Sequence, residues 1–537
     1  MERSDESGTL FAGAAMDRRG FLRGIAATGA LAGAGGLLAA CGGSSPSSAP
    51  KVGGVGKKRG GSLKVGLTGG SGSDTLDPHN GLTYLDTARA QSLYNPLVQL
   101  GVNAQTQYVL AESITAKTPT EFIIRLKPGI TFHSGKPLTA DDVIYTFRRI
   151  VSGKFSGASS LGPMDLAGLK ALDKLTVQVP MTAPFASLID QMAFWYYLYI
   201  IPDGFDPKKD KPNGTGPFVY QNFTPGQRSV FTRNPNYWRH GLPLVDSVTI
   251  IDFSDNVALQ NALTTGAIHA AGALEGPQIA ALSTNSGIRT VAAQTGAITP
   301  FTMRVDFPPF NDVRVRQALR LLVDRQHLID SALDGYGVAA SDVFSPYDPD
   351  FDHSLQRVQD IAQAKSLLKA AGHSNLKVTL TTSAVATGTV AMATVLAEQA
   401  KAAGVTITLN TVSPTVFFGK GNGRDTGYLN WPFSQDFYNY SPFLAQTAQS
   451  MLKASPFNET HTTSRQTLYD QANATLDPAG RKQILTEMQT LDFNTGGYII
   501  PAFIDALDAY STQITGYGRG KVGQPLSNLD FQYYAFV

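Results

Sequence analysis

The chain has 537 residues, of which 42% are hydrophobic and 16% are charged, and its net charge is +2. A chain of this length is too long to fold around one hydrophobic core, so at least two lobes are expected. Four cations lie between Cys41 and Ser62, and without them the net charge becomes −2, which argues against a nucleic-acid surface. Because Cys41 is the only cysteine, a disulfide within the chain is excluded.

A charged stretch followed by an apolar run stands near the N-terminus. The stretch Asp17 to Arg23 reads DRRGFLR, and Ile25 to Ala40 is rich in Ala, Gly and Leu. At about 1.5 Å per residue this run is too short to cross a hydrocarbon core of about 30 Å. These flanks predict a signal peptide over residues 1–40 instead of a membrane span. Met16 is hypothesised to be the true start, because it gives an ordinary short charged region.

Two short motifs in this segment resemble export signals. Arg18 and Arg19, followed by Phe-Leu, resemble the twin-arginine signal, although Asp17 and Arg23 stand where Ser or Thr and Lys are usual. The run Leu38 to Cys41 (LAAC) resembles the bacterial lipobox, which implies that Cys41 carries an acyl anchor and becomes the first residue. The alternative is an incidental buried thiol. The Gly/Ser/Pro/Lys composition of residues 41–62 predicts a flexible linker.

Folded structure is expected to begin with an alternating strand at Ser62 to Leu67. Further along, Thr139 and Asp142 form a capping-box pattern before a helix with one apolar face, made of Val143, Ile144, Phe147 and Ile150. Helical and strand patterns mix through the rest of the chain.

The second half contains three predicted features in order. Asp312 can cap a single helix that extends to Ile329. A helix over 361–371 ends at Gly372, the residue type expected just past a helix end. The run LKVTLTTS, a helix reaching Ala403, and then VTITLN follow as a predicted βαβ unit.

Four motifs occur in a fixed order along the body: FHSGKPLTADDV from Phe132, GTGPF from Gly214, RNPNYW from Arg233 and FNDVRVRQAL from Phe310. Together they resemble the family 5 extracytoplasmic solute-binding proteins, the peptide, nickel and oligosaccharide receptors of ABC importers. The resemblance covers the chain from Ser62 onward. The motifs themselves read as fold markers: Gly214 and Gly216 allow close backbone passage, and His133 is expected in a hydrogen-bonded turn.

The resemblance implies an α/β fold of the large, cluster C type of periplasmic binding protein, with a ligand cleft between two lobes. The expected organisation is lobe I over 63–300, lobe II over 301–498, and a return to lobe I over 499–537. The two crossings between lobes are expected near 298–304 and 498–503. Ligand binding would close the lobes about this hinge.

In the peptide-binding members of the family, a carboxylate three residues after a Trp pairs with the peptide α-ammonium group. Trp431 matches that Trp, but Ser434 stands at the carboxylate position and Asp436 lies two residues later. Either Asp436 takes the role through a local shift, or the ammonium contact is absent.

Aromatic residues crowd the same segment, with Tyr428 and Trp431 as the candidates for ligand contact. Trp431 fits a ligand-facing wall and ordinary core packing equally well, whereas core packing suits the other aromatics better. In the first lobe, the stretch LDPHNGLTYLD resembles a family segment that contacts ligand just after its Leu-Asp-Pro-His, and it points to Leu82, Thr83 and Tyr84. Asp77 and His79 are expected to fix the turn.

The expected function is a lipid-anchored receptor outside the cell membrane or in the periplasm. It would capture oligopeptides and deliver them to the permease subunits of an ABC importer. The alternative within this class is another small solute, such as an oligosaccharide or a nickel chelate, and the alternative of another class is an anchored hydrolase. No nucleophile elbow, zincin or P-loop motif is present, so no enzymatic activity, cofactor or metal is expected. We expect a monomer that binds no nucleic acid.

Overall fold

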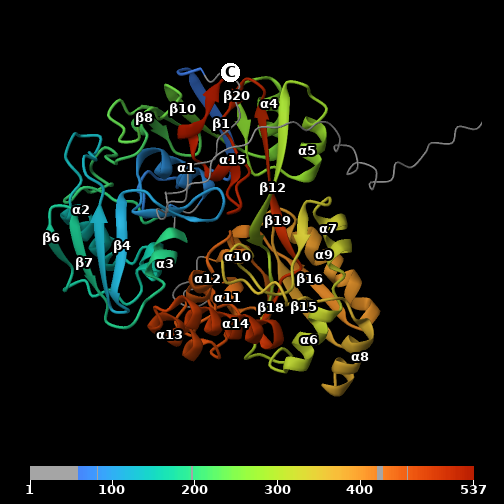
Figure 1. Ribbon diagram of the computed structural model, residues 1–537. Coiled ribbons are helices and arrows are strands. Elements are labelled where there is room, and N and C mark those ends of the chain that lie inside the picture. Colours follow the sequence, from blue (N-terminus) through green and yellow to red (C-terminus); the bar gives the residue numbers. More distant parts are fainter. Residues whose placement is uncertain (1–57, 82, 195–196, 420–426, 456) are drawn as a thin grey trace, which may run out of the picture. The chain divides into compact units, whose positions relative to one another are not determined.

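The computed structural model describes residues 58–81, 83–194, 197–419, 427–455 and 457–537 (Figure 1). The predictions for the signal peptide with Arg18 and Arg19, for the acyl site Cys41 and for Leu82 lie outside the described residues.

The largest sheet has eight strands, in the order β12–β19–β11–β1–β10–β9–β8, with β14 paired to β19. The strands are β1 (Ser62–Thr68), β8 (Phe218–Thr224), β9 (Arg228–Arg233), β10 (Ser247–Phe253), β11 (Ala270–Ala271), β12 (Ile288–Ile298), β14 (Gly337–Ala339) and β19 (Ala502–Ser511). The predicted strand at Ser62 is confirmed: Leu63, Val65 and Leu67 are fully buried. Helices that contact this sheet include α1 (Tyr84–Leu93), α4 (Asn256–Thr264) and α5 (Gly276–Leu282).

A separate antiparallel sheet of four strands has the order β4–β5–β7–β6. Its strands are β4 (Ala111–Thr118), β5 (Glu121–Leu126), β6 (Lys170–Asp173) and β7 (Thr176–Pro180), and α2 (Ala140–Ser152) packs against it. The predicted capping box is present. The Thr139 side chain accepts a hydrogen bond from the Asp142 amide, and the Asp142 side chain accepts one from the Thr139 amide. The apolar face of α2 is buried as predicted, at Val143, Ile144, Phe147 and Ile150. Beside this sheet lie β2 (Val98–Leu100), β3 (Thr106–Tyr108) and α3 (Leu188–Phe194).

A third sheet of five strands has the order β16–β15–β17–β13–β18. The strands are β13 (Phe301–Met303), β15 (Lys377–Thr382), β16 (Thr406–Thr411), β17 (Phe433–Gln435) and β18 (Tyr498–Ile499). The predicted βαβ unit is confirmed, because β15 and β16 are parallel neighbours joined through α9 (Thr389–Ala400). The helix before it, α8 (Ile361–Ala370), ends as predicted before Gly372, whose φ is +80°.

The remaining elements are α6 (Val313–Leu321), α7 (Arg325–Ala332), α10 (Pro414–Phe418), α11 (Gly427–Asn430), α12 (Phe443–Ser450), α13 (Gln466–Ala474), α14 (Pro478–Thr495), α15 (Pro525–Asn528) and the pair β20 (Ile514–Thr515) and β21 (Ala535–Phe536). Among the described residues, no helix has both the length and the apolar character that crossing a membrane requires.

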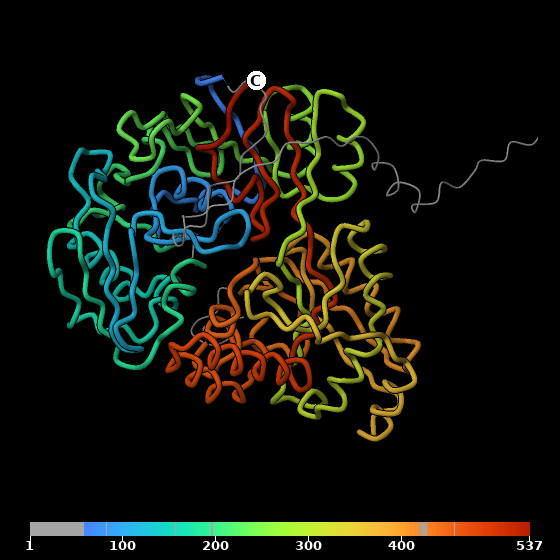
Figure 2. The backbone as a smooth tube through the Cα atoms, in the orientation of Figure 1, coloured from blue at the N-terminus to red at the C-terminus, as the bar shows by residue number. Residues whose placement is uncertain are grey.

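Two backbone segments pass between the eight-stranded and the five-stranded sheet. β12 runs into β13 with only two residues between them, and β18 runs into β19 in the same way. The segments are antiparallel partners on both sides of the passage, with Ile298 opposite Phe503 and Phe301 opposite Ile499. Figure 2 shows them side by side in the backbone trace. A third contact between the two parts is β14, which follows β13 in the chain and pairs with β19 of the eight-stranded sheet.

The prediction of one helix from Asp312 to Ile329 is wrong. Asp312 does cap a helix, but α6 ends at Leu321 and α7 starts at Arg325. The break occurs because Asp324 has an extended backbone and its side chain accepts a hydrogen bond from the amide of His327. It therefore caps a new helix within the continuous apolar pattern.

The family motifs have the structural roles that the sequence suggested. A Cβ atom at Gly214 would lie 2.0 Å from the carbonyl oxygen of Leu93, so only glycine fits that position. Tyr237 and Trp238 combine packing with a polar contact each, to Gln532 and Asn95, as large amphipathic side chains do. The ring of His133 contacts the Gly214 amide and the Gly216 carbonyl, and burial lowers its pKa to about 4. His133 is thus a neutral turn residue.

Candidate functional site

The segment that carries most predicted ligand contacts crosses the five-stranded sheet. Ser434 lies in the middle of β17, between β13 and β15, and is fully buried. Its hydroxyl is 3.5 Å from the carbonyl oxygen of Tyr428. The position that holds a carboxylate in the common family pattern is therefore occupied by a buried hydroxyl.

Asp436 follows the carboxyl end of β17 and is only 5% exposed. Its Oδ1 atom has no hydrogen-bond partner among the described residues. Burial raises the pKa of Asp436 well above its ordinary value, and the neighbouring Glu459 carboxyl raises it further. A carboxyl in such surroundings favours its neutral form.

Glu459 is the second carboxyl of this site, and it is fully buried. Its Oε1 atom accepts hydrogen bonds from the hydroxyls of Tyr438, at 2.9 Å, and Tyr498, at 2.8 Å. Its Oε2 atom has no geometric hydrogen-bond partner within the described part of the chain. Burial raises the pKa of Glu459 to about 7, although the two tyrosine hydroxyls oppose the shift.

We name Asp436 and Glu459 the acid pair. Neither member forms an ion pair with a lysine, arginine or histidine among the described residues. Two interacting carboxyls titrate as a unit, and burial without a cation keeps at least part of the pair protonated at neutral pH.

An aromatic cluster lies next to the acid pair. The Phe417 ring stacks on Tyr428 with centroids 5.4 Å apart and lies equally close to Trp431. Phe418 makes an edge contact with Tyr428 at 5.7 Å and is 40% exposed. Tyr428 is buried and Trp431 is half-buried. Trp431 thus combines packing against Phe417 with a partly open surface, which suits a wall residue.

The other predicted contacts lie at the start of α1. Thr83 caps this helix in a capping box with Asp86, and Tyr84 is its first residue. The Tyr84 hydroxyl donates a hydrogen bond of 3.1 Å to Oδ1 of Asn439, three residues after Asp436. Among the described contacts, Asn439 links the two groups of predicted residues; no direct contact joins Tyr84 to Trp431 or Asp436.

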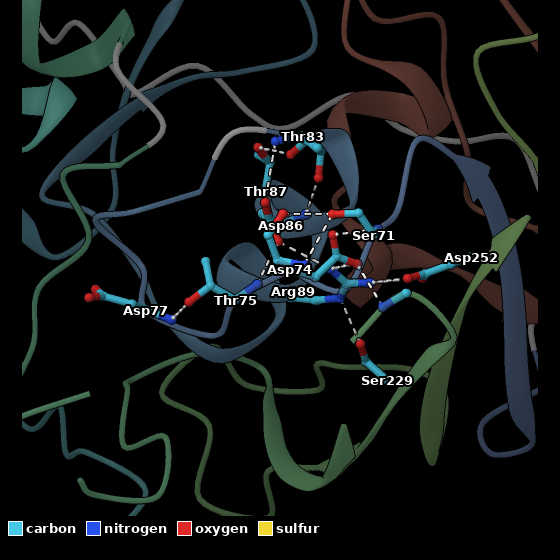
Figure 3. Close-up of polar contacts among 12 residues, drawn as sticks. Ser71, Asp74, Thr75, Asp77, Thr83, Asp86, Thr87, Arg89, Ser229 and Asp252 are labelled. Carbon is cyan, nitrogen blue, oxygen red and sulfur yellow. Dashed lines mark hydrogen bonds and ion pairs between the residues drawn. The ribbon is translucent and has the colours of Figure 1, made fainter. Parts of the chain in front are cut away.

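The loop before α1 is fixed by buried charges, as Figure 3 shows. The guanidinium of Arg89 contacts Asp74, Asp86 and Asp252, and we name these four residues the Arg89 network. Burial raises the pKa of Asp252 to about 6, against the opposing charge of Arg89.

The predicted turn roles of Asp77 and His79 are also confirmed. Asp77 accepts a hydrogen bond from the His79 amide and forms an ion pair with Arg149 at 2.6 Å. The His79 ring bonds the carbonyl oxygen of Tyr199, and burial lowers its pKa to about 4. Both residues hold the loop and neither offers a free group.

A cavity of about 310 Å³ lies between the ends of α5, α7 and α9 and strand β19. Three carboxyl side chains line it, from Glu275, Asp334 and Asp505, and its described lining includes no lysine, arginine or histidine. Burial raises the pKa of Asp505. None of the predicted ligand residues lines this cavity, so it does not coincide with the predicted site.

The sequence reasoning missed Glu459 and Asn439. Glu459 lies in the polar stretch NETHTT, which carries no motif, and it reaches the site only because the chain returns beside β13 and β18. Asn439 is three residues from a singled-out aspartate, but only the fold shows that it meets Tyr84. The missing carboxylate at position 434 pointed to Asp436, and no sequence signal pointed to Glu459.

Residues 105–483 match the profile of the bacterial extracellular solute-binding proteins, family 5. The glutathione-binding protein GsiB of Salmonella paratyphi A is 28% identical over 309 residues, which is 57% of this chain and 60% of that protein's length. GsiB of Escherichia coli O1:K1 is 26% identical over 474 residues, covering 83% of this chain and 90% of that protein.

Solved structures share the fold at low sequence identity. The oligopeptide-binding protein AppA of Bacillus subtilis, in complex with a nonapeptide, has a TM-score of 0.73 and 19% identity, covering 90% of this chain and all of that one. NikA of Staphylococcus aureus, in complex with Ni(L-His)2, has a TM-score of 0.72 and 19% identity, covering 89% of this chain and all of that one. The predicted α/β, two-lobe fold of periplasmic-binding-protein type is confirmed. The chain belongs to the family 5 bacterial extracellular solute-binding proteins.

Proposed function

We propose that this protein is the lipid-anchored, extracytoplasmic receptor of an ABC importer, which captures oligopeptides between two lobes and delivers them to permease subunits. The observation that carries the proposal is the family match over residues 105–483, supported by likeness to E. coli GsiB along 83% of the chain. A receptor returns its ligand unchanged, so the proposal includes no enzymatic activity.

The lobe boundaries proposed here are 63–300 with 499–537 for lobe I, and 301–498 for lobe II. Their support is the pair of adjacent passages between β12 and β13 and between β18 and β19. Two adjacent passages, each with two residues between its strands, can bend together, which is the usual geometry of hinge closure.

The acid pair is the proposed recognition site for the ligand's ammonium group. Asp436 and Glu459 are buried carboxyls without a cationic partner among the described residues, next to the aromatic cluster of Trp431. An ammonium group would supply the missing positive charge, and charge-assisted hydrogen bonds to a carboxylate are the stronger kind. Ser434, Tyr428, Thr83, Tyr84 and the undescribed Leu82 complete the proposed contacts.

Anchoring by Cys41 is a separate part of the proposal, because it rests on the lipobox-like LAAC alone. Mass spectrometry of the protein from its membrane fraction should find an acylated Cys41 at the N-terminus. The Cys41→Ser variant should leave the membrane, and its retention there would contradict the anchor.

The test of ligand class is thermal unfolding of the unacylated Cys41→Ser chain with defined ligand pools. The pools are short free-amine peptides, their N-acetylated forms, glutathione, oligosaccharides and nickel–histidine chelates. A ligand at about 100 times its dissociation constant should stabilise the protein by about 2.7 kcal/mol. Stabilisation by free-amine peptides alone supports the proposal. A response only to sugars or chelates would replace the peptide by that ligand, and turnover of any ligand would favour the hydrolase alternative.

A further inference from the structure

The Arg89 network fixes the start of α1, where Thr83 and Tyr84 lie. Arg89 lies within α1 and is fully buried. Its Nη2 donates to both carboxylate oxygens of Asp252 at 2.8 Å, and its Nε donates to the Ser229 hydroxyl at 2.7 Å. Its Nη1 lies 2.9 Å from Asp74 Oδ2 and 3.1 Å from Asp86 Oδ1. Each guanidinium nitrogen is therefore engaged.

Asp86 passes this restraint to the residues that the proposed function assigns to ligand. Its Oδ1 accepts a hydrogen bond from the Thr75 amide at 3.0 Å, and its Oδ2 accepts one from the Thr83 amide at 3.4 Å. The Asp86 amide donates in turn to the Thr83 hydroxyl at 3.1 Å. Arg89 therefore bonds Asp86 directly and acts on the backbone of Thr83 only through Asp86. It is not itself one of the predicted ligand contacts.

Asp74 fixes the other end of the same loop. Its carboxylate accepts hydrogen bonds from the Ser71 amide at 2.9 Å and from the Gly226 amide, in the turn between β8 and β9, at 3.3 Å. Residues 71–83 contain no helix or strand where they are described, so their path depends on such side-chain bonds. Figure 3 shows Asp74 of the loop, Asp86 of α1, Ser229 of β9 and Asp252 of β10 around the Arg89 guanidinium.

Tyr84 connects the start of α1 with the 436–439 segment of the predicted site. Its hydroxyl bonds Asn439, close in sequence to Asp436 of the acid pair. A hydrogen bond tolerates little displacement, because its strength falls steeply with distance and angle. A small movement of the first turn of α1 would therefore break the contact between Tyr84 and the 436–439 segment.

We propose that Arg89 is a positioning residue for ligand binding: through Asp86 it sets the place of Thr83 and Tyr84 against the 436–439 segment. The part of this inference that concerns ligand binding rests on the proposed function. No sequence motif marks Arg89. Its proposed role is to position residues of the site, whereas the proposed role of the acid pair is to contact the ligand.

Lysine is the informative replacement for Arg89. It keeps the buried positive charge, but its ammonium is a point donor and cannot serve three carboxylates and a hydroxyl in one plane. Arg325→Lys is the matched control, because Arg325 is buried and pairs with Asp342 at 3.0 Å in a different part of the fold. If Arg89→Lys fails to fold, Asp86→Asn weakens the same link while keeping an acceptor at that position.

The first experiment is hydrogen–deuterium exchange of the full, ligand-free Cys41→Ser chain. In Arg89→Lys, peptides covering 71–87 should exchange at least about tenfold faster than in the parent, while those covering β15 and α9 should not change. Arg325→Lys should leave 71–87 unchanged. Unaltered exchange of 71–87 in Arg89→Lys, or equal acceleration throughout the chain, would overturn the inference.

The second experiment is a double-mutant cycle in affinity, with the tripeptide trialanine as the probe. Tyr84→Phe should cost several-fold in affinity in the parent and almost nothing in Arg89→Lys, because Tyr84 is already displaced there. Trp431→Ala should cost the same in both. Equal losses from Tyr84→Phe in the two backgrounds would overturn the positioning role. Absence of trialanine binding by the parent would count against the proposed ligand instead, and the exchange experiment would still decide the role of Arg89.

Discussion

The Arg89 network and the acid pair both contain buried carboxyls, and they differ in whether a cation lies beside those carboxyls. In the Arg89 network, one guanidinium and several backbone amides face Asp74, Asp86 and Asp252. In the acid pair, Glu459 accepts hydrogen bonds from two tyrosine hydroxyls, and burial together with the Glu459 carboxyl raises the pKa of Asp436. No cation among the described residues compensates the second site.

This difference indicates different roles. Burying a carboxylate is costly unless it is paired, so a compensated set holds structure and an uncompensated set is neutral until a cation arrives. The Arg89 network should therefore dominate stability at neutral pH. The acid pair should dominate the dependence of stability and ligand binding on pH.

The largest effect is expected from removing the cation of the compensated set. Arg89→Met leaves three carboxyls buried without their partner and should lower the free energy of unfolding by about 3–5 kcal/mol at pH 7, if the chain folds at all. Denaturation by urea, followed by circular dichroism, measures this loss. In contrast, Glu459→Gln should be neutral or stabilising at the same pH, and a loss as large as that of Arg89→Met would abolish the distinction between the two sites.

The next effect is the pH dependence of the acid pair. Because the pKa of Glu459 is raised from about 4.5 to about 7 in the folded protein, its contribution to stability is fully present below pH 4.5 and is lost as the pH rises through 7. Between these limits the loss should be about 3 kcal/mol.

The variant Glu459→Gln isolates that contribution. Unfolding free energies of the parent and the variant, measured from pH 5 to pH 8, should diverge as the pH rises, with the variant the more stable at pH 8. Other buried acids, such as Asp508 with a pKa of about 7, titrate in both proteins and cancel in the difference. Parallel curves would show that Glu459 does not titrate in this range.

A smaller effect is expected on ligand selectivity. Asp436→Asn removes one carboxylate of the acid pair and should weaken binding of free-amine peptides about tenfold, the loss of a charge-assisted hydrogen bond of roughly 1.4 kcal/mol. Titration calorimetry with each peptide and its N-acetylated form measures the selectivity. If the acetylated peptide loses as much affinity, Asp436 acts on the fold of the site and not on the amine.

The smallest effect should come from the hydrogen bond that links the two regions. Tyr84→Phe removes the bond to Asn439 and should cost about 1 kcal/mol in unfolding free energy, while leaving the packing of the ring intact. Asn439→Ala in the same background should add little more. A fully additive loss in the double variant would mean that the two side chains do not interact in solution.

Much of the fold could be predicted from local sequence patterns. The capping box at Thr139, the Gly372 helix end and the βαβ unit of β15, α9 and β16 rest on contacts close in sequence. The break between α6 and α7 was missed because the apolar pattern runs on through it, and the capping by Asp324 competes successfully with continuation of the helix.

The site could be predicted only in part. Trp431, Asp436 and Tyr84 are predictions from resemblance to a family pattern, and the structure gives Asp436 as a buried carboxyl that adds to the effect of burial in raising the pKa of Tyr428. Glu459 could not be found, because its meeting with Tyr438 and Tyr498 joins segments that lie apart in the chain. Charge compensation by Arg89 likewise depends on distant strands, β9 and β10.

The most direct test of the account is the number of protons released when a free-amine peptide binds the parent protein. Titration calorimetry at pH 6.5 in two buffers of different protonation enthalpy gives this number. The account predicts release of up to about one proton per peptide, reduced in Glu459→Gln, because an ammonium group replaces a proton on the acid pair. Tight binding with no proton release, or the same affinity for the N-acetylated peptide, would contradict it.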